Sequence, residues 1–324
     1  MLPDNVPCFD DRSTMPTAFV LGAGLGTRLR PITDKFPKPL VPVGHEPLIT
    51  WAFRHLAQDW GANRFVINTH HLPAAYAADF PTATWNGYPL AFRHEPVLLD
   101  TGAGLANVRD LLPADESVAI YNGDILCDAP LGALADEHAR HAADVTMLLR
   151  SGGALRNVVC PLIADESAPA GCPAGPVLDI RGLLGRDGPC YQFAGICLVS
   201  PAFLAALPAP DHAYSLIPQI VETIRLGGRV RGVLIDAGHW SDLGTADALL
   251  AAHTLLLNSP FPRYAPHTFQ RIHPEAQVAP ATMDEASWAG PGVVIPAGCV
   301  VSRSLVLAGT HLAPGTVLNA EVVC

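Results

Sequence analysis

Residues 18–44 read AFVLGAGLGTRLRPITDKFPKPLVPVG. An apolar run that ends at Leu21 leads into a glycine-rich turn with Gly22, Gly24 and Gly26. Glycine lacks a Cβ, so successive backbone N–H groups in such a turn can approach an anion closely. The stretch therefore predicts a buried strand followed by a phosphate-binding turn.

The segment after this turn carries the only two lysines of the chain. Lys and Arg together number 20, and Lys35 and Lys38 are the only lysines among them. Two lysines three residues apart beside a glycine turn therefore indicate function rather than solvation. Because a lysine ammonium is a compact point charge suited to a phosphate oxygen, we expect this pair to lie near bound phosphate.

Two familiar glycine motifs do not fit this stretch. The dinucleotide-binding fingerprint needs glycine at the position that Thr27 occupies. A P-loop needs a Gly-Lys pair, and the sequence contains none. These mismatches argue against a nicotinamide oxidoreductase and against a P-loop enzyme.

Residues 22–43 resemble the signature G-x-G-T-R-L-x-P-x-T-x-x-x-P-K-P-L-x-P-V of sugar-1-phosphate nucleotidyltransferases, also called nucleotide-sugar pyrophosphorylases. The resemblance implies transfer of a nucleotidyl group from a nucleoside triphosphate to a sugar 1-phosphate. It makes Arg28 and Lys38 the catalytic residues. It also implies nucleotide binding by residues of the turn, namely Leu21, Gly22, Ala23, Gly24, Gly26 and Thr27.

Composition limits the other classes of function. The length of 324 residues suggests about two domains, and a net charge of −10 argues against a nucleic-acid partner. Residues 1–14 do not read as a secretory signal, and the apolar stretch 248–257 is too short to span a membrane. The eight cysteines lack a C-x-x-C pair and are expected to be reduced and buried. We expect a soluble cytoplasmic protein.

The pattern after the first motif predicts alternating helices and strands. Residues 46–60 place apolar side chains at helical spacing, and residues 64–69 read as a strand. Such alternation predicts an α/β fold with a mostly parallel, Rossmann-like sheet, and the family resemblance implies a GT-A-like domain. The expected organisation is a flexible tail at 1–15, a nucleotidyltransferase domain at 16–257, a linker at 258–270 and a C-terminal repeat at 271–324.

A second flexible turn lies at residues 94–107, HEPVLLDTGAGLAN. It resembles the loop of the family that holds base and ribose, which implies that Thr101 and Gly102 bind nucleotide. The alternative is a plain helix start capped by Thr101. Glu95 could accept the adjacent N–H donors of guanine, which favours GTP slightly over UTP.

The family resemblance implies that two aspartates hold Mg²⁺. Asp124 ends the run SVAIYNGD at the carboxyl end of a predicted strand, where α/β sheets bind ligands. Residues 233–245, VLIDAGHWSDLGT, resemble the family segment that supplies a second carboxylate, here Asp242. The alternative for Asp242 is a turn residue that caps the following helix. Mg²⁺ needs only one or two protein carboxylates when substrate phosphates complete its shell.

The sugar side departs from the family pattern. The resemblance implies sugar-phosphate contacts at Asn122, Asn157, Asp179, Arg181 and Gly195. Where many relatives carry a lysine, Arg181 could contact the phosphate with its bidentate fork. Phe193 stands where relatives have asparagine, so this sugar pocket is expected to be more apolar or built differently.

The last 55 residues change character. Apolar side chains recur every six residues among Gly, Pro, Ala, Ser and Thr, at Trp288, Val294, Val300, Val306, Leu312 and Leu318. This spacing predicts a hexapeptide-repeat left-handed parallel β-helix with about 18 residues per coil and roughly three coils. We expect it to cover an edge or to form a subunit interface in a homo-oligomer.

Several alternatives stay open from sequence alone. Resemblances point both to mannose-1-phosphate guanylyltransferases and to N-acetylmuramate-1-phosphate uridylyltransferases, so the base and the sugar are undecided. A non-catalytic regulatory subunit would be expected to lack Lys38, Asp124 or Asp242, and all three are present. A hexapeptide acyltransferase would depend on His311. For the other histidines we expect a structural role at 70–71 and an exposed helix face at His138 and His141.

Overall fold

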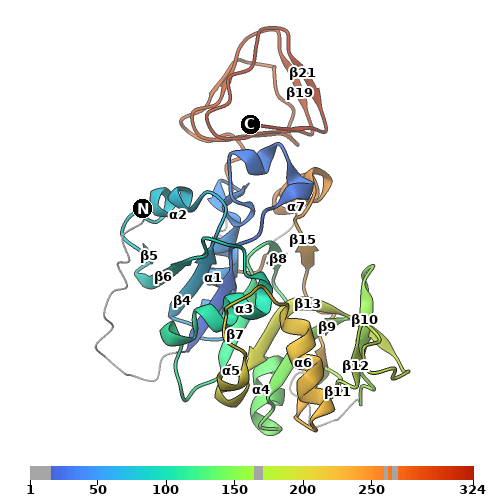
Figure 1. The fold of residues 1–324 in the computed structure, drawn as a ribbon. Helices are drawn as coiled ribbons and strands as arrows, with labels where there is room; N and C mark the ends of the chain where they lie inside the picture. Colours follow the sequence, from blue (N-terminus) through green and yellow to red (C-terminus); the bar gives the residue numbers. More distant parts are fainter. Residues whose placement is uncertain (1–15, 164–170, 259–261, 265–268) are drawn as a thin grey trace.

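The computed structural model describes residues 16–163, 171–258, 262–264 and 269–324. An α/β part occupies the lower portion of Figure 1, and a triangular C-terminal coil of residues 271–324 lies above it. The predicted tail at 1–15 and most of the predicted linker at 258–270 lie outside the described residues.

The α/β part is built on one mixed sheet of eleven strands. Nine of them follow the order β11-β14-β9-β13-β7-β1-β4-β6-β5, and β10 and β12 extend the sheet beside β13. The strands are β1 (Thr17–Leu21), β4 (Arg64–Thr69), β5 (Thr84–Trp85), β6 (Tyr88–His94), β7 (Val118–Asn122), β9 (Val145–Arg150), β10 (Arg156–Val159), β11 (Ala174–Pro176), β12 (Asp179–Ile180), β13 (Cys190–Val199) and β14 (Val230–Leu234).

The centre of this sheet is parallel, as predicted. Strand β1 pairs in parallel with β4 and β7, β4 pairs in parallel with β6, and β9 does so with β14. Strand β13 differs, because it lies antiparallel between β7 and β9, and the outer strands β5, β10, β11 and β12 also pair antiparallel. A strand buried on both faces reads as a continuous apolar run in either direction, so the sequence of β13 does not reveal its orientation.

Helices cover both faces of the sheet. They are α1 (Leu48–Asp59), α2 (Pro73–Asp79), α3 (Asp100–Asn107), α4 (Gly132–Arg140), α5 (Pro201–Ala206), α6 (Leu216–Arg225) and α7 (Ala246–Asn258), with short 3-10 turns η1 (Thr27–Leu29), η2 (Ile32–Asp34), η3 (Lys38–Leu40) and η4 (Arg109–Leu111). The helix predicted at 46–60 corresponds to α1. The turn expected at 94–107 runs into α3, which begins at Asp100 and is followed by η4.

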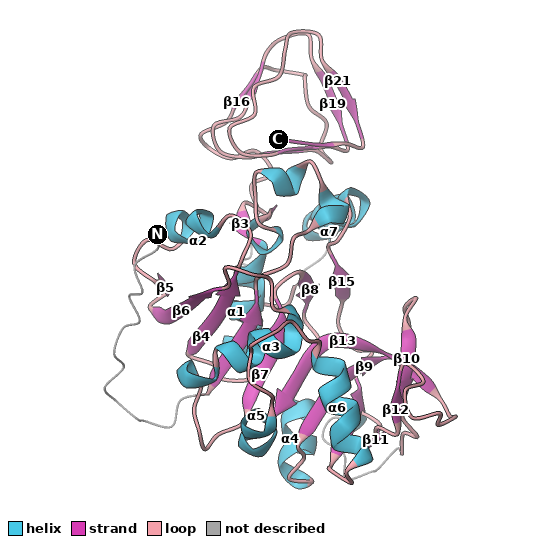
Figure 2. Cartoon of the chain, viewed as in Figure 1, coloured by secondary structure: helices cyan, strands magenta, loops and turns pink. Residues whose placement is uncertain are grey.

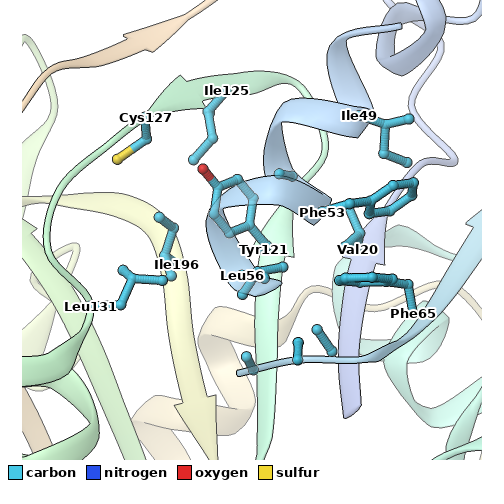
Figure 3. Close-up of a cluster of buried hydrophobic side chains, with 14 of the residues drawn as sticks. Val20, Ile49, Phe53, Leu56, Phe65, Tyr121, Ile125, Cys127, Leu131 and Ile196 are labelled. Atoms are coloured by element: carbon cyan, nitrogen blue, oxygen red, sulfur yellow. The ribbon is translucent and has the colours of Figure 1, made fainter. Parts of the chain in front are cut away.

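Alternate residues of β1 build two separate cores, one on each face of the sheet. Val20 packs with residues of α1, whereas Phe19 packs with the core on the opposite face. Figure 3 shows the α1 side, where the rings of Phe53 and Phe65 lie 4.6 Å apart. The period of two along a strand and the apolar stripe of a helix account for this layering.

Two short pairs of antiparallel strands lie near the charged residues that the sequence predicted. Strands β8 (Ile125–Cys127) and β15 (Trp240–Asp242) pair antiparallel, with Ile125 opposite Asp242. Strands β2 (Pro42–Val43) and β3 (Glu46–Pro47) form a small hairpin after η3. The β8–β15 ribbon is what brings Asp242 beside Asp124, because Asp124 directly precedes Ile125.

The C-terminal coil runs through short parallel pairings. Its strands are β16 (Gln277–Val278), β17 (Trp288–Ala289), β18 (Val294–Ile295), β19 (Val300–Ser302), β20 (Leu305–Val306), β21 (Val317–Asn319) and β22 (Val322–Val323). Trp288 pairs with Leu305 and Leu305 with Val322, so one coil takes 17 residues. Figure 2 shows the triangular path. The arrangement is compatible with the predicted β-helix, whose handedness stays a prediction.

Two expectations about individual side chains are wrong. Val300 was expected to point inward but is exposed, and its neighbour Val301 is buried instead, since a coil of 17 residues does not keep a strict period of six. His138 was expected on an exposed face but is buried, with its ring nitrogens hydrogen-bonded to the hydroxyls of Thr146 and Ser117. Spacing on a helix does not by itself say which face is covered.

A third expectation, that the cysteines are buried, is wrong for Cys190, which is exposed; the expectations that follow fit the described residues. His70 and His71 hydrogen-bond the backbone carbonyls of Glu95 and Thr33, a structural role. Among the described cysteines none forms a disulfide, and Cys127, Cys160, Cys197 and Cys299 are buried. Within the described ranges no helix has the length and apolarity needed to cross a membrane.

Candidate active site

The glycine turn is anchored at its first residue. The N–H of Gly22 donates to the Oδ1 of Asn68 at 2.9 Å, and the hydroxyl of Tyr76 donates to the Gly22 carbonyl at 2.9 Å. A Cβ on Gly22 would lie 2.6 Å from the Asn68 carbonyl oxygen. Glycine is therefore required here for the close approach of β1 to β4.

The three glycines of the turn differ in what surrounds them. Gly26 has a φ of +61° and a Cβ there would lie 2.7 Å from Thr33, so this position also needs glycine. A Cβ on Gly24, by contrast, would meet no atom within 4 Å, and this residue borders a cavity. The conformation of the turn thus depends on Gly22 and Gly26, whereas Gly24 keeps the space above the turn open.

Lys38 lies at the centre of a charged cluster. Its Nζ is 2.6 Å from Oδ2 of Asp124 and 2.9 Å from Oδ1 of Asp242. Nη2 of Arg28 lies 3.1 Å from the other oxygen of Asp242. The Lys38 side chain is 7% exposed, whereas that of Arg28 is 66% exposed. The structure therefore brings together the four charged residues that the sequence predicted.

The electrostatics of Asp242 follow from this cluster. Burial alone would raise the pKa of its carboxyl, but hydrogen bonds and charge from Lys38 and Arg28 hold that pKa below its usual value. Asp242 is therefore ionised at neutral pH. A cation is favoured between the two carboxylates, and in this structure the Lys38 ammonium occupies that position.

These carboxylates fit the predicted Mg²⁺. Carboxylate oxygens are the hard donors that Mg²⁺ prefers, and the Lys38 ammonium between them is a stand-in cation at the same place. No cluster of three or more His, Cys, Asp or Glu side chains suited to a metal occurs in the described part of the chain. Two carboxylates suffice where substrate phosphates and water complete the shell.

A cavity of about 420 Å³ opens on one side of Lys38. It is bordered by the glycine turn, the end of β4 and the start of α3. Its lining is Leu21, Ala23, Gly24, Lys38, Pro39, Asn68, Glu95, Leu98, Asp100, Thr101, Asn122, Asp124 and Ala213. Of the residues predicted to bind nucleotide, the lining lacks Gly22, Gly26, Thr27 and Gly102. We call this space the first cavity.

Glu95 is built into the wall of the first cavity. Its Oε1 accepts from Nδ2 of Asn68 at 2.8 Å, and its Oε2 accepts from the Leu99 N–H at 3.1 Å. Burial raises the pKa of this carboxyl above its usual value, although both hydrogen bonds oppose that rise. Asn68 thereby links Glu95 to the backbone of Gly22.

Thr101 and Gly102 connect α3 to the segment before α6. The Thr101 hydroxyl accepts from the Leu216 N–H at 3.0 Å rather than capping its own helix. A Cβ on Gly102 would lie 2.6 Å from the Tyr214 ring, and the Gly102 N–H donates to the Tyr214 carbonyl. Thr101 lines the first cavity, whereas Gly102 supports it through packing.

A second cavity of about 280 Å³ lies on the other side of the carboxylates. Asn122 and Asp124 border both cavities. The lining of the second cavity is Asn122, Asp124, Ile125, Leu155, Asn157, Ile180, Arg181, Gln192, Phe193, Ala194, Gly195, Ile217, Trp240 and Asp242. The two cavities therefore meet at the charged cluster.

The predicted sugar-side residues divide into two groups. Asn157, Arg181 and Gly195 line the second cavity, and Gly195 has a φ of +80° that lets the backbone pass within contact of Asn122. Asp179 is buried outside the lining, where its carboxylate accepts from the N–H groups of Leu184 and Arg186. It shapes the turn that presents Arg181.

Sequence reasoning missed Asn68, Gln192 and Trp240. Asn68 is a polar residue near the end of an otherwise apolar strand, a signal that could have pointed to a ligand edge. Gln192 accepts from the Leu155 N–H, and Trp240 donates through Nε1 to the Ala194 carbonyl at 2.8 Å. Trp240 lies in the segment 233–245 that resembles the family, which could have pointed to it, whereas nothing in the local sequence of Gln192 marks it as a site residue.

Comparison with known proteins agrees with this geometry. Residues 17–152 match the family model described as Nucleotidyl transferase. The chain carries a nucleotidyl transferase domain. The matched range holds the glycine turn, Lys38, Glu95 and Asp124, so it includes most of the first cavity.

Relatives of the nucleotidyl transferase domain extend the comparison to the whole chain. A mannose-1-phosphate guanylyltransferase of Mycobacterium tuberculosis is 28% identical over 310 residues, which cover 94% of this chain and 79% of the relative. A mannose-1-phosphate guanylyltransferase catalytic subunit beta of Dictyostelium discoideum is 33% identical over 41% of this chain and 37% of its own length.

Solved structures share the fold at lower identity. A UDP-glucose pyrophosphorylase from Acinetobacter baumannii superposes with a TM-score of 0.61 at 16% identity, covering 75% of this chain and 95% of that one. A UDP-glucose pyrophosphorylase complexed with UDP-glucose gives a TM-score of 0.58 at 16% identity, covering 74% and 97%. These similarities show that the α/β part has the fold of nucleotide-sugar pyrophosphorylases.

Proposed function

We propose that this protein transfers a nucleotidyl group from a nucleoside triphosphate to a sugar 1-phosphate, with release of pyrophosphate. The observation that carries the proposal is the meeting of two cavities at Lys38, Asp124 and Asp242. A two-substrate reaction between phosphates needs two adjoining pockets with positive charge at the junction. Lys38, together with Mg²⁺ held by the two carboxylates, would supply that charge where the reacting phosphates would meet.

The first cavity would take the nucleoside triphosphate. Backbone N–H groups of the glycine turn would contact the phosphates, and Gly24 leaves the space for them. Arg28 would neutralise the leaving pyrophosphate. Its ion pair with Asp242 is largely exposed and therefore weak, so the guanidinium can turn toward a phosphate at little cost.

The chemistry would be a direct in-line displacement. An oxygen of the sugar phosphate attacks the α-phosphorus, the bond from that phosphorus to the β-phosphate oxygen breaks, and pyrophosphate leaves on the opposite side. Lys38 would contact the α-phosphate and the attacking phosphate, where negative charge crowds in the transition state. Mg²⁺ held by Asp124 and Asp242 would supply charge neutralisation and orient the phosphates.

The second cavity would take the sugar 1-phosphate. Arg181 is the one positively charged side chain among the described residues that line it. Asn122, Asn157 and Gln192 offer amide groups for sugar hydroxyls, and Trp240 and Phe193 offer ring surface. Arg181 would hold the sugar phosphate on the side away from Lys38.

For the substrates we propose GTP with a mannose-1-phosphate-like sugar. The relatives named mannose-1-phosphate guanylyltransferases support this choice, and Glu95 in the wall of the first cavity can accept from guanine. UTP with N-acetylmuramate 1-phosphate or another hexose 1-phosphate is the second candidate. Asn68, which hydrogen-bonds both Glu95 and the Gly22 backbone, would hold the wall of the first cavity in place with either base.

A screen of pyrophosphate release tests the proposal. The purified protein is given Mg²⁺ and each pairing of GTP, UTP, dTTP, CTP and ATP with mannose-, glucose-, heptose- and N-acetylmuramate-1-phosphate. We expect turnover that requires both substrates and is fastest with GTP and mannose 1-phosphate. Binding of ligands without turnover of any pair would favour a non-catalytic regulatory subunit instead.

A further inference from the structure

A single hydrophobic cluster lies behind the charged residues of the site. Each of the four charged residues has a near neighbour in the chain that belongs to this cluster. The pairs are Arg28 with Leu29, Lys38 with Val41, Asp124 with Leu126 and Asp242 with Leu243. The placement of all four charges therefore depends on how this one cluster packs.

The C-terminal coil supplies part of the same cluster. Trp288, Leu305 and Leu307 belong to it together with the residues named above, whereas the coil's own interior forms a separate cluster. Figure 1 shows the base of the coil directly above α7 and the segment that follows η3. The coil is thus a structural part of the frame around the site.

Trp288 lies where two site-bearing segments meet. Its ring centroid is 4.9 Å from that of His253 and 5.3 Å from that of His45. His45 ends the short hairpin turn that follows η3 and Lys38. His253 lies on α7, which begins four residues after Asp242. The Gly44 N–H donates to Nε2 of His253 at 3.2 Å, which ties the two segments together beneath the indole.

Packing alone holds the indole ring of Trp288 in this position. The residue is 2% exposed, and its indole N–H has no hydrogen-bond partner in the described part of the chain. The gap beside it, between His45, His253 and Leu307, is only about 20 Å³. The ring is therefore closely packed against both segments, and its loss would leave a cavity into which the two segments could shift.

We propose that Trp288 is a positioning residue, through which the coil sets the distance between Lys38 and Asp242. The consequence for catalysis rests on the proposed function; the consequence for the Lys38 ion pairs does not. Because a displacement of about 1 Å can cost about 100-fold in rate, a small shift of either segment is sufficient to slow turnover.

The two lysines of the chain allow a test that needs no activity. Uniform isotope labelling of lysine gives NMR side-chain signals from Lys38 and Lys35 alone. Lys38 is buried between two carboxylates, whereas Lys35 is exposed, so their signals should be well separated. The full-length protein and its variants are compared at a temperature well below the unfolding of each variant.

In Trp288→Ala we expect the Lys38 signal to shift or broaden while the Lys35 signal is unchanged. Trp288→Phe, which keeps a ring, should restore the parental Lys38 signal. The matched control is Leu318→Ala, because Leu318 is buried in the coil's own interior and not in the cluster behind the site. A parental Lys38 signal in folded Trp288→Ala, or the same change in Leu318→Ala, would overturn the inference.

If Trp288→Ala does not fold, Trp288→Leu provides the same comparison with a smaller loss of volume. Turnover is measured in parallel, with an expected fall in kcat of roughly ten- to 100-fold for Trp288→Ala and parental kcat for Leu318→Ala. A parental protein that turns over no substrate pair would contradict the proposed function alone. The Lys38 signal would then still decide the positioning role.

Discussion

The two cavities meet at one charged cluster but are built in different ways. The first is walled by the glycine turn and by the linked side chains of Asn68 and Glu95, which are fixed by hydrogen bonds to backbone. In the second, Arg181 has no side-chain partner among the described residues and is exposed. The first cavity, proposed for the nucleotide, is pre-organised, whereas the second, proposed for the sugar phosphate, offers the Arg181 guanidinium among amides and rings.

This difference suggests that the junction of the cavities determines the type of reaction, whereas the second cavity determines the choice of sugar. The first cavity and the cluster lie in segments that resemble the family signature, and we propose that they carry out the phosphate chemistry. The second lies where the chain departs from the family, at Arg181 and Phe193. Changes at the junction should therefore abolish turnover, and changes within either cavity should weaken one substrate only.

The largest effect is expected at the junction. Lys38→Met removes the ammonium but keeps much of the side-chain volume, so kcat should fall by about 10² to 10³, or about 3–4 kcal/mol of barrier. Lys35→Met is the matched control, since this exposed lysine lies three residues away. Steady-state pyrophosphate release measures both variants. Equal effects of the two substitutions would remove Lys38 from its proposed place at the reacting phosphates.

A smaller effect, confined to the first cavity, is expected for Gly24→Ala. The added methyl meets no atom of the folded protein but enters the space proposed for phosphate. KM for the nucleotide should rise about tenfold, the size of one lost charged hydrogen bond, with unchanged melting temperature and unchanged KM for the sugar phosphate. Gly22→Ala, by contrast, should lower the melting temperature because its Cβ would clash with β4.

The reciprocal effect is expected in the second cavity. Arg181→Ala should raise KM for the sugar 1-phosphate by roughly tenfold, because a charged contact to phosphate is lost, and should leave KM for the nucleotide unchanged. Arg181→Lys keeps the charge but loses the bidentate fork, so its KM for the sugar 1-phosphate should lie between those of the parent and of Arg181→Ala. If KM for the nucleotide rose instead, the division of substrates between the cavities would be reversed.

The smallest effect concerns the base. Burial raises the pKa of Glu95 above its usual value, so as the pH falls this carboxyl should take up a proton, and lose its role as an acceptor for guanine, sooner than an exposed glutamate would. The ratio of KM for GTP to KM for UTP should then be higher at pH 5 than at pH 8. Using the ratio cancels titration of the triphosphates. A ratio that is constant with pH would argue against base recognition by Glu95.

Sequence alone predicted the parts of the molecule with local signatures. The strand before Gly22, the strand that ends near Asp124 and the helix after Thr245 follow from apolar runs and turn residues. The meeting of Lys38 with Asp124 and Asp242, more than eighty residues away, followed from the family resemblance. The comparisons confirm the nucleotidyl transferase domain within residues 17–152.

Other features depend on tertiary packing and could not be predicted. The orientation of β13 and the burial of His138 depend on which neighbours cover them. The wall formed by Asn68 and Glu95 depends on the pairing of β4 with β6. The contact of Trp288 with His45 and His253 depends on how the coil meets the α/β part. A repeat pattern predicts a coil but not its docking surface.

The fate of the sugar-phosphate oxygens tests the central claim most directly. The sugar 1-phosphate that gives turnover is prepared with ¹⁸O in its non-bridging phosphate oxygens, and products are analysed by ³¹P NMR. Direct attack on the α-phosphorus predicts labelled oxygen in the bridge between the two phosphorus atoms of the nucleotide sugar and none in pyrophosphate. Label in the released pyrophosphate would contradict the account of two substrates meeting at Lys38.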